Sequence, residues 1–400
     1  MGQTEATDAM GRKPDYADAT VAVVCGLALA FTLLFLGVIP LARNLYGGRD
    51  FVVYWSTGQQ LAHHADPYDT GAMDRLEHGA GYVGKGTFYM RNPPWGLGLT
   101  LPLGFFPARW ISLPWSLMVF GVAGLCAHLI WQILGRPPTP LPLLAYAFPP
   151  VLMCVIMGQT SLFLLLGLAL FLRFHRTQPF WAGAGLWFCT LKPHVLLPFG
   201  VVLLLWIVMT RSYKILLGAL AALAVSCGAT ELLDPAAWMQ YAHWSRTSGI
   251  SGEFIPCLSV ALRNWINPRA AWIAFVPVAI GTVFAVEYFR RHRHHWDWME
   301  HGNLLVLVSV MVAPYCWVYD QSLALAGVLY GVSRTRSRPL LAVLALMYAG
   351  VMVQPSFTAN LDSAFYIWPS IAWLVWFQLA RRSGQRADVK PVAVTAEALG

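Results

Sequence analysis

The stretch PPWGLGLTLPLGFFP, residues 93–107, decides how this chain is threaded through a membrane. The chain has 400 residues, of which 57% are hydrophobic and 12% charged, a composition typical of a protein solvated by lipid. The stretch is apolar, but each of its prolines lacks a backbone hydrogen-bond donor, which disfavours a membrane-spanning helix. If it crossed the membrane, every later loop would change sides.

Positive charges in the later loops favour a surface position for this stretch. Cytoplasmic loops of membrane proteins are enriched in Lys and Arg. When 93–107 lies along the outer surface, most of the 27 Lys and Arg residues fall on the cytoplasmic side, including those of SRTRSR (333–338) and ARRSGQR (380–386). A crossing would place both motifs outside. We therefore predict that 93–107 does not cross.

Hydropathy and this charge rule predict an all-α integral membrane protein with about twelve transmembrane helices. The apolar stretches lie at 19–41, 110–134, 140–157, 160–174, 179–191, 193–210, 213–231, 269–288, 303–317, 321–333, 339–353 and 363–380. Between the first two, FVVYWSTGQQLAHH (51–64) is compatible with a short helix in the membrane interface.

This topology divides the chain into three parts. We predict a cytoplasmic segment over 1–18, a membrane domain over 19–383 and a disordered, polar cytoplasmic tail over 384–400. Two outer loops, 42–109 and 232–268, leave the membrane domain on the periplasmic side.

The charge and cysteine content exclude several classes of function. The net charge of +8 comes from basic residues in short segments between apolar runs, which indicates membrane orientation and not nucleic-acid binding. The seven cysteines form no disulfide framework and no metal-type spacing. The run RRHRHHWDWMEH (290–301) is better explained by contact with anionic lipid than by a metal. We predict no metal and no cofactor.

Asp50 is the candidate catalytic residue. It follows the first apolar stretch, in GGRDFVVYW (47–55), so its carboxyl group is held near the membrane surface beside aromatic rings. Partial desolvation there would raise its basicity, which suits a general base. The alternative is a helix cap, because Asp before a helical run accepts backbone hydrogen bonds.

Lys192 is the second candidate residue. CTLKPHVLLPF (189–199) places this cation at an outer turn between two apolar runs, against the charge trend of the other short loops. Lys192 and His194 are therefore candidates for binding a lipid phosphate, as is Arg91 in YMRNPPW (89–95). The alternatives are a snorkelling lysine and an arginine that contacts headgroups.

Two more outer turns, GQTS (158–161) and YCWVYDQ (315–321), place polar side chains on the same side as Asp50 and Lys192. The candidate substrate-binding residues are Tyr54, Asn92, Gln159, Tyr319 and Asp320. Each is also suited to a helix cap or an interhelical hydrogen bond.

These pieces, in this order, resemble glycosyltransferase family 87, whose C-type membrane glycosyltransferases include polyprenol-phosphate-mannose-dependent alpha-1,2-mannosyltransferases. The motifs that carry the resemblance are DFVVYWSTGQQLAHHADPYD (50–69), FYMRNPPW (88–95), GQTSLFLLLGLAL (158–170), AGAGLWFCTLKPHVLLP (182–198) and APYCWVYDQSLAL (313–325). Each motif is loose, and their order and spacing carry the specificity.

The resemblance implies a GT-C-type fold with an acidic catalytic residue in the first outer loop, at the position of Asp50. It also implies that the PPW segment lies at the outer surface and that the KP turn meets the donor phosphate, hence Lys192. Family members often have Tyr or Phe directly before the PP pair, where this chain has Arg91 and Asn92. Some carry His near Tyr319 and Asp320, so the sugar and the acceptor stay open.

The expected function is an inverting glycosyltransferase. It would move mannose, or another hexose or pentose, from a polyprenyl-phosphate donor to a lipid or glycan acceptor at the outer face of the cytoplasmic membrane. Asp50 would act as the base, and Lys192 with Arg91 or His194 would stabilise the leaving phosphate. The competing classes are a polyprenyl-linked glycolipid transporter or flippase and an envelope scaffold, but no inverted repeat is apparent.

Overall fold

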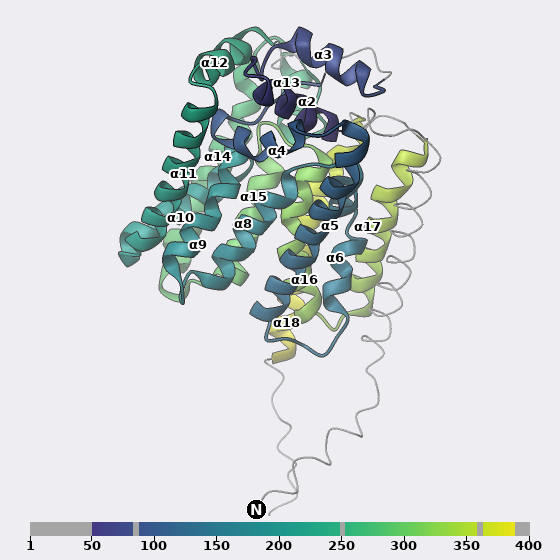
Figure 1. Ribbon diagram of the computed structural model, residues 1–400. Coiled ribbons are helices and arrows are strands. Elements are labelled where there is room, and N and C mark those ends of the chain that lie inside the picture. Colours follow the sequence, from purple (N-terminus) through teal and green to yellow (C-terminus); the bar gives the residue numbers. More distant parts are fainter. Residues whose placement is uncertain (1–49, 83–87, 249–252, 358–362, 389–400) are drawn as a thin grey trace, which may run out of the picture.

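Every regular element that the structure describes is a helix (Figure 1). The computed structural model describes residues 50–82, 88–248, 253–357 and 363–388, of which 354–357 and 385–388 by their backbone only. The predicted first span at 19–41 and the cytoplasmic segment 1–18 lie outside the described residues.

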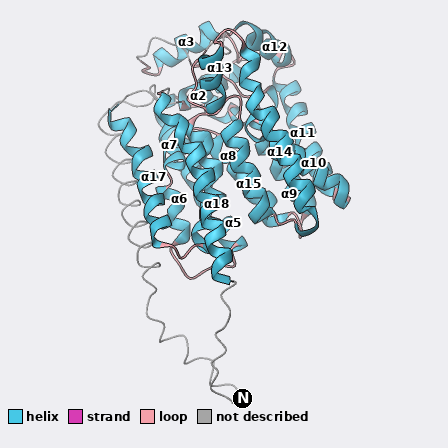
Figure 2. Cartoon of the chain, turned by 180° about the vertical axis from the view of Figure 1, so that it is seen from behind, coloured by secondary structure: helices cyan, strands magenta, loops and turns pink. Residues whose placement is uncertain are grey.

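Nine helices of the described chain run roughly side by side and form the body of the molecule (Figures 1 and 2). They are α5 (Ala108–Ile133), α8 (Ser161–Phe174), α10 (Leu197–Thr210), α11 (Tyr213–Leu233), α14 (Val276–His292), α15 (Asn303–Val312), α16 (Leu325–Arg334), α17 (Arg338–Phe357) and α18 (Trp368–Asp388). The last of these continues to Asp388, so the predicted disordered tail does not begin at 384.

Four segments of the described chain are long and apolar enough to cross a membrane. They are Ala108–Ile133, Pro193–Thr210, Tyr213–Leu233 and Ala271–His295. Shorter apolar helices cover Ser161–Phe174, Trp298–Val312 and Arg338–Val353. The all-helical fold is confirmed in the described residues, and these spans support a membrane protein. The count of twelve spans stays a prediction.

Two of the predicted spans form short helices, one of them broken at a proline. The stretch 140–157 forms η3 (Leu141–Leu143), α6 (Leu144–Ala147) and α7 (Pro149–Met157), and 179–191 forms α9 (Pro179–Gly185) and η4 (Leu186–Leu191). A further turn, η5 (Pro193–Leu196), precedes α10. A proline cannot donate to the preceding turn and restricts the residue before it, so α7 and η5 begin at prolines. The change from α9 to η4 at Leu186 has no proline. Even α7 is only about 14 Å long, less than half a hydrocarbon core.

The stretch 93–107 also forms short helices and not one span. It contains η2 (Pro94–Leu99) and α4 (Leu101–Gly104), and α5 begins just after it. Gly58 of α2 (Phe51–Ala62) meets Gly104 so closely that any side chain at either position would collide with the opposite backbone. The segment is therefore packed against α2 through its backbone.

Helices from both predicted outer loops gather at one end of the molecule. Figure 1 shows α2, α3 (Thr70–Gly79), α12 (Ala237–Thr247) and α13 (Leu258–Ile266) at the upper end of the long helices, as does the reverse view in Figure 2. Chain segments more than 150 residues apart in sequence thus share one end.

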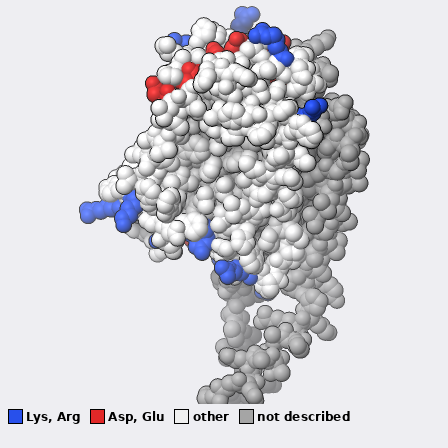
Figure 3. Space-filling view, viewed as in Figure 1, with Lys and Arg blue, Asp and Glu red and all other residues white. Residues whose placement is uncertain are grey.

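The face of the molecule seen in Figure 3 has charged ends and an uncharged middle. Figure 3 shows acidic and basic side chains at the upper end of the face in view, basic side chains at its lower edge, and a middle band without charge. Where α5 begins, Phe105, Phe106 and Trp110 are exposed, and exposed aromatic rings are common at membrane interfaces. This pattern supports a membrane protein.

Candidate active site

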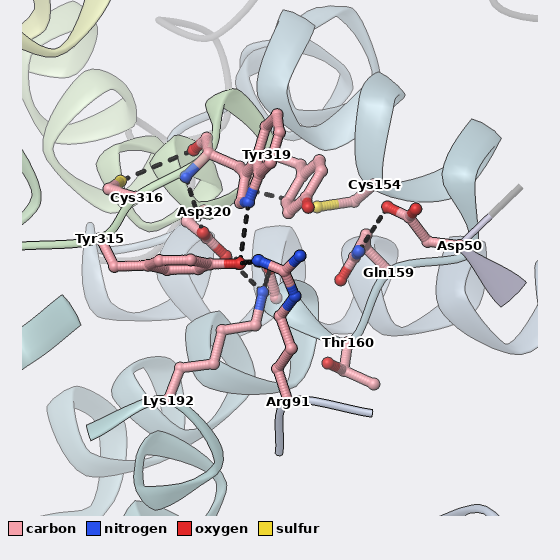
Figure 4. Close-up of polar contacts among 12 residues, drawn as sticks. Asp50, Arg91, Cys154, Gln159, Thr160, Lys192, Tyr315, Cys316, Tyr319 and Asp320 are labelled. Carbon is pink, nitrogen blue, oxygen red and sulfur yellow. Dashed lines mark hydrogen bonds and ion pairs between the residues drawn. The ribbon is translucent and has the colours of Figure 1, made fainter. Parts of the chain in front are cut away.

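Four segments and Arg91 bring polar side chains together (Figure 4), and one of these segments leads into α2 at the upper end of Figure 1. The four segments are Asp50 before α2, the turn 158–161 before α8, Lys192 between η4 and η5, and 315–320, which leads into η10 (Val318–Ala324). The packing of α8 against both η4 and η10 unites segments that are far apart in the sequence.

Asp50 stands at the N-terminus of α2 without capping it. Its side chain makes no capping hydrogen bond, and Oδ2 instead accepts a hydrogen bond of 2.5 Å from Gln159 Nε2. The alternative of a helix cap is therefore wrong. Burial raises the pKa of Asp50 above 3.8, opposed by the Gln159 hydrogen bond and by the charges of Lys192 and Arg91.

Tyr54 fixes the orientation of the Gln159 amide. Its hydroxyl donates to Gln159 Oε1 at 2.8 Å and lies 3.1 Å from Thr160 Oγ1. Burial raises the pKa of Tyr54 to about 12, so the hydroxyl keeps its proton at neutral pH. With Oε1 occupied, Gln159 presents its Nε2 donor to Asp50.

The turn before α8 is held by a glycine and a tryptophan. Gly158 has φ of 70°, in the left-handed region that glycine enters without strain, and its carbonyl accepts 2.7 Å from Trp115 Nε1. Trp115 lies seven residues after Ala108, where α5 begins. The turn before α8 is therefore tied to α5 about 10 Å, or two helical turns, along the chain from where α5 begins.

Lys192 is buried and paired, so it does not snorkel. It is 8% exposed, and its Nζ lies 2.6 Å from Asp320 Oδ1 and 3.0 Å from Ser161 Oγ. The fully buried Asp320 also accepts from Ser161 Oγ at 2.6 Å and from the Trp317 backbone N–H at 2.9 Å. The Lys192 ammonium further lies 5.1 Å from the centre of the Tyr319 ring. These contacts hold the ammonium in one place.

Arg91 links the two predicted outer loops. Its Nη1 donates to the Tyr315 hydroxyl, its Nη2 donates to Glu253 Oε2 at 2.8 Å, and its guanidinium lies 5.5 Å from the centre of the Tyr315 ring. Trp317 Nε1 donates to the same hydroxyl at 3.0 Å. Arg91 and Glu253 keep 28% and 35% of their side-chain surfaces exposed, so water reaches this pair.

His194 lies on the other side of Tyr315. The two rings meet edge to face, with their centres 5.3 Å apart. The buried Nε2 atom of His194 has no hydrogen-bond partner within the described part of the chain. Because a buried, unpaired ring nitrogen costs free energy, this atom is suited to a ligand.

The described residues contain no group of three His, Cys, Asp or Glu side chains that could hold a metal ion. In the histidine-rich run 290–301, His301 Nδ1 lies 2.8 Å from the Tyr288 hydroxyl, and His292 stacks on the Tyr288 ring at 4.2 Å. Both histidines thus have aromatic partners.

Comparison with known families assigns the chain. The model for glycosyltransferase family 87 matches residues 89–314, more than half of the chain. The chain belongs to glycosyltransferase family 87. No match was found among curated proteins or among solved structures.

Membership in family 87 indicates a glycosyltransferase and gives no support to the flippase alternative. The matched range contains Arg91, Gln159 and Lys192, but it begins after Asp50 and ends before Asp320. The proposed roles of those two residues therefore rest on geometry.

The cluster of this family 87 glycosyltransferase includes eight of the nine residues selected from the sequence. The exception is Asn92, which is 5% exposed and whose described contact is through its backbone carbonyl, a 3.0 Å acceptor for the Tyr68 hydroxyl. Tyr319 contributes its ring face to Lys192, and its carbonyl accepts from Cys154 Sγ at 3.2 Å.

Sequence reasoning missed Glu253, Ser161 and Tyr315. Ser161 and Tyr315 belong to motifs that were recognised, so their place in the cluster could have been suspected. Glu253 lies in the second outer loop without a motif, and only its contact with Arg91 distinguishes it. The complete cluster combines a partly desolvated carboxylate with two held cations, an arrangement that can deprotonate a hydroxyl beside an anionic group.

Proposed function

We propose that this protein moves a sugar from a polyprenyl-phosphate donor to a hydroxyl group of a glycolipid or glycan, with inversion at the anomeric carbon. The sugar is mannose or another hexose or pentose. The observation that carries the proposal is the hydrogen-bonded Asp50 carboxyl in the same cluster as Lys192 and Arg91. The family indicates glycosyl transfer, and this cluster supports a phosphate-bearing donor.

The proposed reaction has one proton transfer and one displacement. Asp50 takes the proton of the acceptor hydroxyl, and the oxygen forms a bond to the anomeric carbon from the face opposite the phosphate. The bond between that carbon and the phosphate oxygen breaks, and its electron pair leaves with the polyprenyl phosphate. Because phosphate is a good leaving group, no general acid is required.

Positive charge stabilises the phosphate as its negative charge grows. Arg91 has exposed surface and further N–H groups to offer, and Lys192 has one ammonium proton beyond those used by Asp320 and Ser161. His194 can donate a further hydrogen bond in the tautomer that carries its proton on Nε2. Among the proposed substrate-binding residues, Gln159 and Tyr54 hold the base, Asp320 and Tyr319 hold Lys192, and Asn92 lies next to Arg91.

We place this chemistry at the outer face of the cytoplasmic membrane. The support is electrostatic, because the end opposite the cluster has a basic edge in Figure 3, as cytoplasmic ends do. In this orientation both outer loops and the cluster face the periplasm.

The direct test is Asp50→Asn in membranes supplied with polyprenyl-phosphate sugars, with mannose first. Loss of the base lowers transfer by about 100-fold or more. Asp74→Asn, which removes a partly exposed carboxylate of α3, serves as the control and keeps normal transfer. Near-normal transfer by Asp50→Asn would remove Asp50 from the role of base. Mass spectrometry of the product identifies the sugar added.

A further inference from the structure

The two cations of the cluster each face a carboxylate. Lys192 pairs with Asp320 at 2.6 Å, and Arg91 pairs with Glu253 at 2.8 Å. A donor phosphate adds one more anion beside them, so it competes with these carboxylates for the positive charge of the cations, although each cation keeps unused N–H groups. The structure indicates which pair yields.

The Lys192 pair is held too firmly to open. The side chains of Lys192 and Asp320 are 10% and 0% exposed. Asp320 is also bound by Ser161 and by a backbone N–H, so separating it from Lys192 would leave a buried charge without water.

The Arg91 pair opens at much lower cost. Its side chains are 28% and 35% exposed, so water can hydrate Glu253 when the carboxylate leaves. Arg91 need not move far, because the Tyr315 hydroxyl and ring also hold its guanidinium. A phosphate oxygen can then replace Glu253 Oε2 on the same Nη2 atom, with the geometry that guanidinium groups favour.

We propose that Glu253 pairs with Arg91 while no donor is bound and that the lipid phosphate displaces the Glu253 carboxylate from Arg91. This inference rests on the proposed function, in which the donor carries a phosphate. Glu253 is then a positioning residue that weakens phosphate binding and acts only through Arg91.

This competition has a reason in the chemistry of the product. The donor phosphodiester carries one negative charge, whereas the polyprenyl phosphate that leaves carries up to two. Arg91 therefore attracts the product more than the donor. The return of Glu253 to Arg91 helps to release the product, so its removal should strengthen product binding more than donor binding.

The probe for the test is a short-chain polyprenyl monophosphate, which contains no sugar and so does not require the sugar to be known. Its Kd is measured on the full chain in lipid nanodiscs. We expect Glu253→Gln to bind it about three- to tenfold more tightly and Arg91→Gln about tenfold more weakly. The double variant should match Arg91→Gln, since Glu253 has no cation left to block.

Two controls make the result specific. Glu231→Gln removes an exposed carboxylate near the C-terminal end of α11. This carboxylate accepts a hydrogen bond from Trp238 Nε1, and the variant should keep the wild-type Kd. Glu253→Asp keeps the negative charge and should bind more weakly than Glu253→Gln. Thermal melting of each variant verifies folding.

Three outcomes would overturn the inference. They are equal or weaker binding by Glu253→Gln, tighter binding that persists without Arg91, and tightening by Glu231→Gln to the same extent. A separate transfer assay distinguishes the two proposals. Transfer without this binding pattern defeats only the role of Glu253, and the binding pattern without transfer defeats only the proposed reaction.

Discussion

At Asp50, burial and hydrogen bonding act on the same carboxyl group in opposite directions. Burial raises its pKa, whereas the Gln159 hydrogen bond and the charges of Lys192 and Arg91 lower it. The net pKa stays above 3.8. A carboxylate in this state is a stronger base than that of a free aspartate.

Gln159→Leu tests this balance. The variant removes the hydrogen bond that stabilises the ionised carboxyl, so the pKa of Asp50 rises further. We expect the acidic limb of the kcat/KM profile to move to higher pH and kcat to fall about tenfold through lost orientation. The profile is measured from pH 4 to 9. Thr160→Val, which removes the neighbouring hydroxyl, should leave this limb in place, and an unmoved limb in Gln159→Leu would contradict the argument.

The individual residues were more predictable than their partners. Asp50 and Lys192 stand out in the sequence because charged residues beside membrane segments are costly and are often functional. Their partners were chosen by tertiary packing. Lys192 and Asp320 are 128 residues apart and Arg91 and Glu253 are 162 apart, and no local pattern reports contacts over such separations.

Among the elements, α3 contains a buried acid that the proposed reaction does not use. Glu77 is 0% exposed, and its Oε2 accepts 2.9 Å from the Phe88 backbone N–H. Burial raises its pKa from 4.5 to about 8. The folded chain therefore binds a proton that the unfolded chain releases above pH 4.5.

This linkage predicts how the stability of α3 depends on pH. The contribution of Glu77 is fully present below pH 4.5 and is lost as the pH rises through about 8. Between pH 6 and pH 9 we expect α3 to lose on the order of 2 kcal/mol of stability. Hydrogen exchange of the α3 amides measures the loss. Glu77→Gln, which cannot ionise, should abolish the dependence, and an equal dependence in that variant would exclude Glu77 as its cause.

Helices could be predicted from hydropathy, but their breaks were harder to foresee. Every apolar stretch in the described chain is helical, since a lipid-solvated backbone must satisfy its own hydrogen bonds. The prolines at 149 and 193 begin new helices, and the first of them breaks the predicted span 140–157. Within 179–191 the chain passes from α9 directly into η4. Prolines also occur inside helices, as Pro114 does in α5, so composition alone does not locate a break.

At the scale of the whole molecule, charge separates the two ends. The upper end in Figure 3 carries both signs of charge, and the lower edge is basic. The orientation that we propose follows from this difference, because the positive-inside rule assigns the basic edge to the cytoplasm.

Cysteine labelling checks the orientation. Thr70→Cys introduces an exposed thiol at the start of α3, and Thr177→Cys introduces one between α8 and α9. In intact cells a membrane-impermeant maleimide should label only the Thr70 variant, at least tenfold above the Thr177 variant, and both should react after permeabilisation. Labelling of Thr177→Cys in intact cells would reverse the topology.

The hydrogen bond from Trp115 to Gly158 has a consequence for how substrates arrive. It ties the turn before α8 to a point on α5 about two turns along the helix from the exposed rings at the start of α5. In the proposed orientation, where α5 runs inward from the outer surface, we expect Gln159 to lie at the depth of the lipid headgroups, although water reaches Arg91. An acceptor anchored in the same leaflet can reach that depth by sideways diffusion. A free sugar in the periplasm would have to descend into a layer that excludes it, so the depth of this turn favours membrane-tethered acceptors.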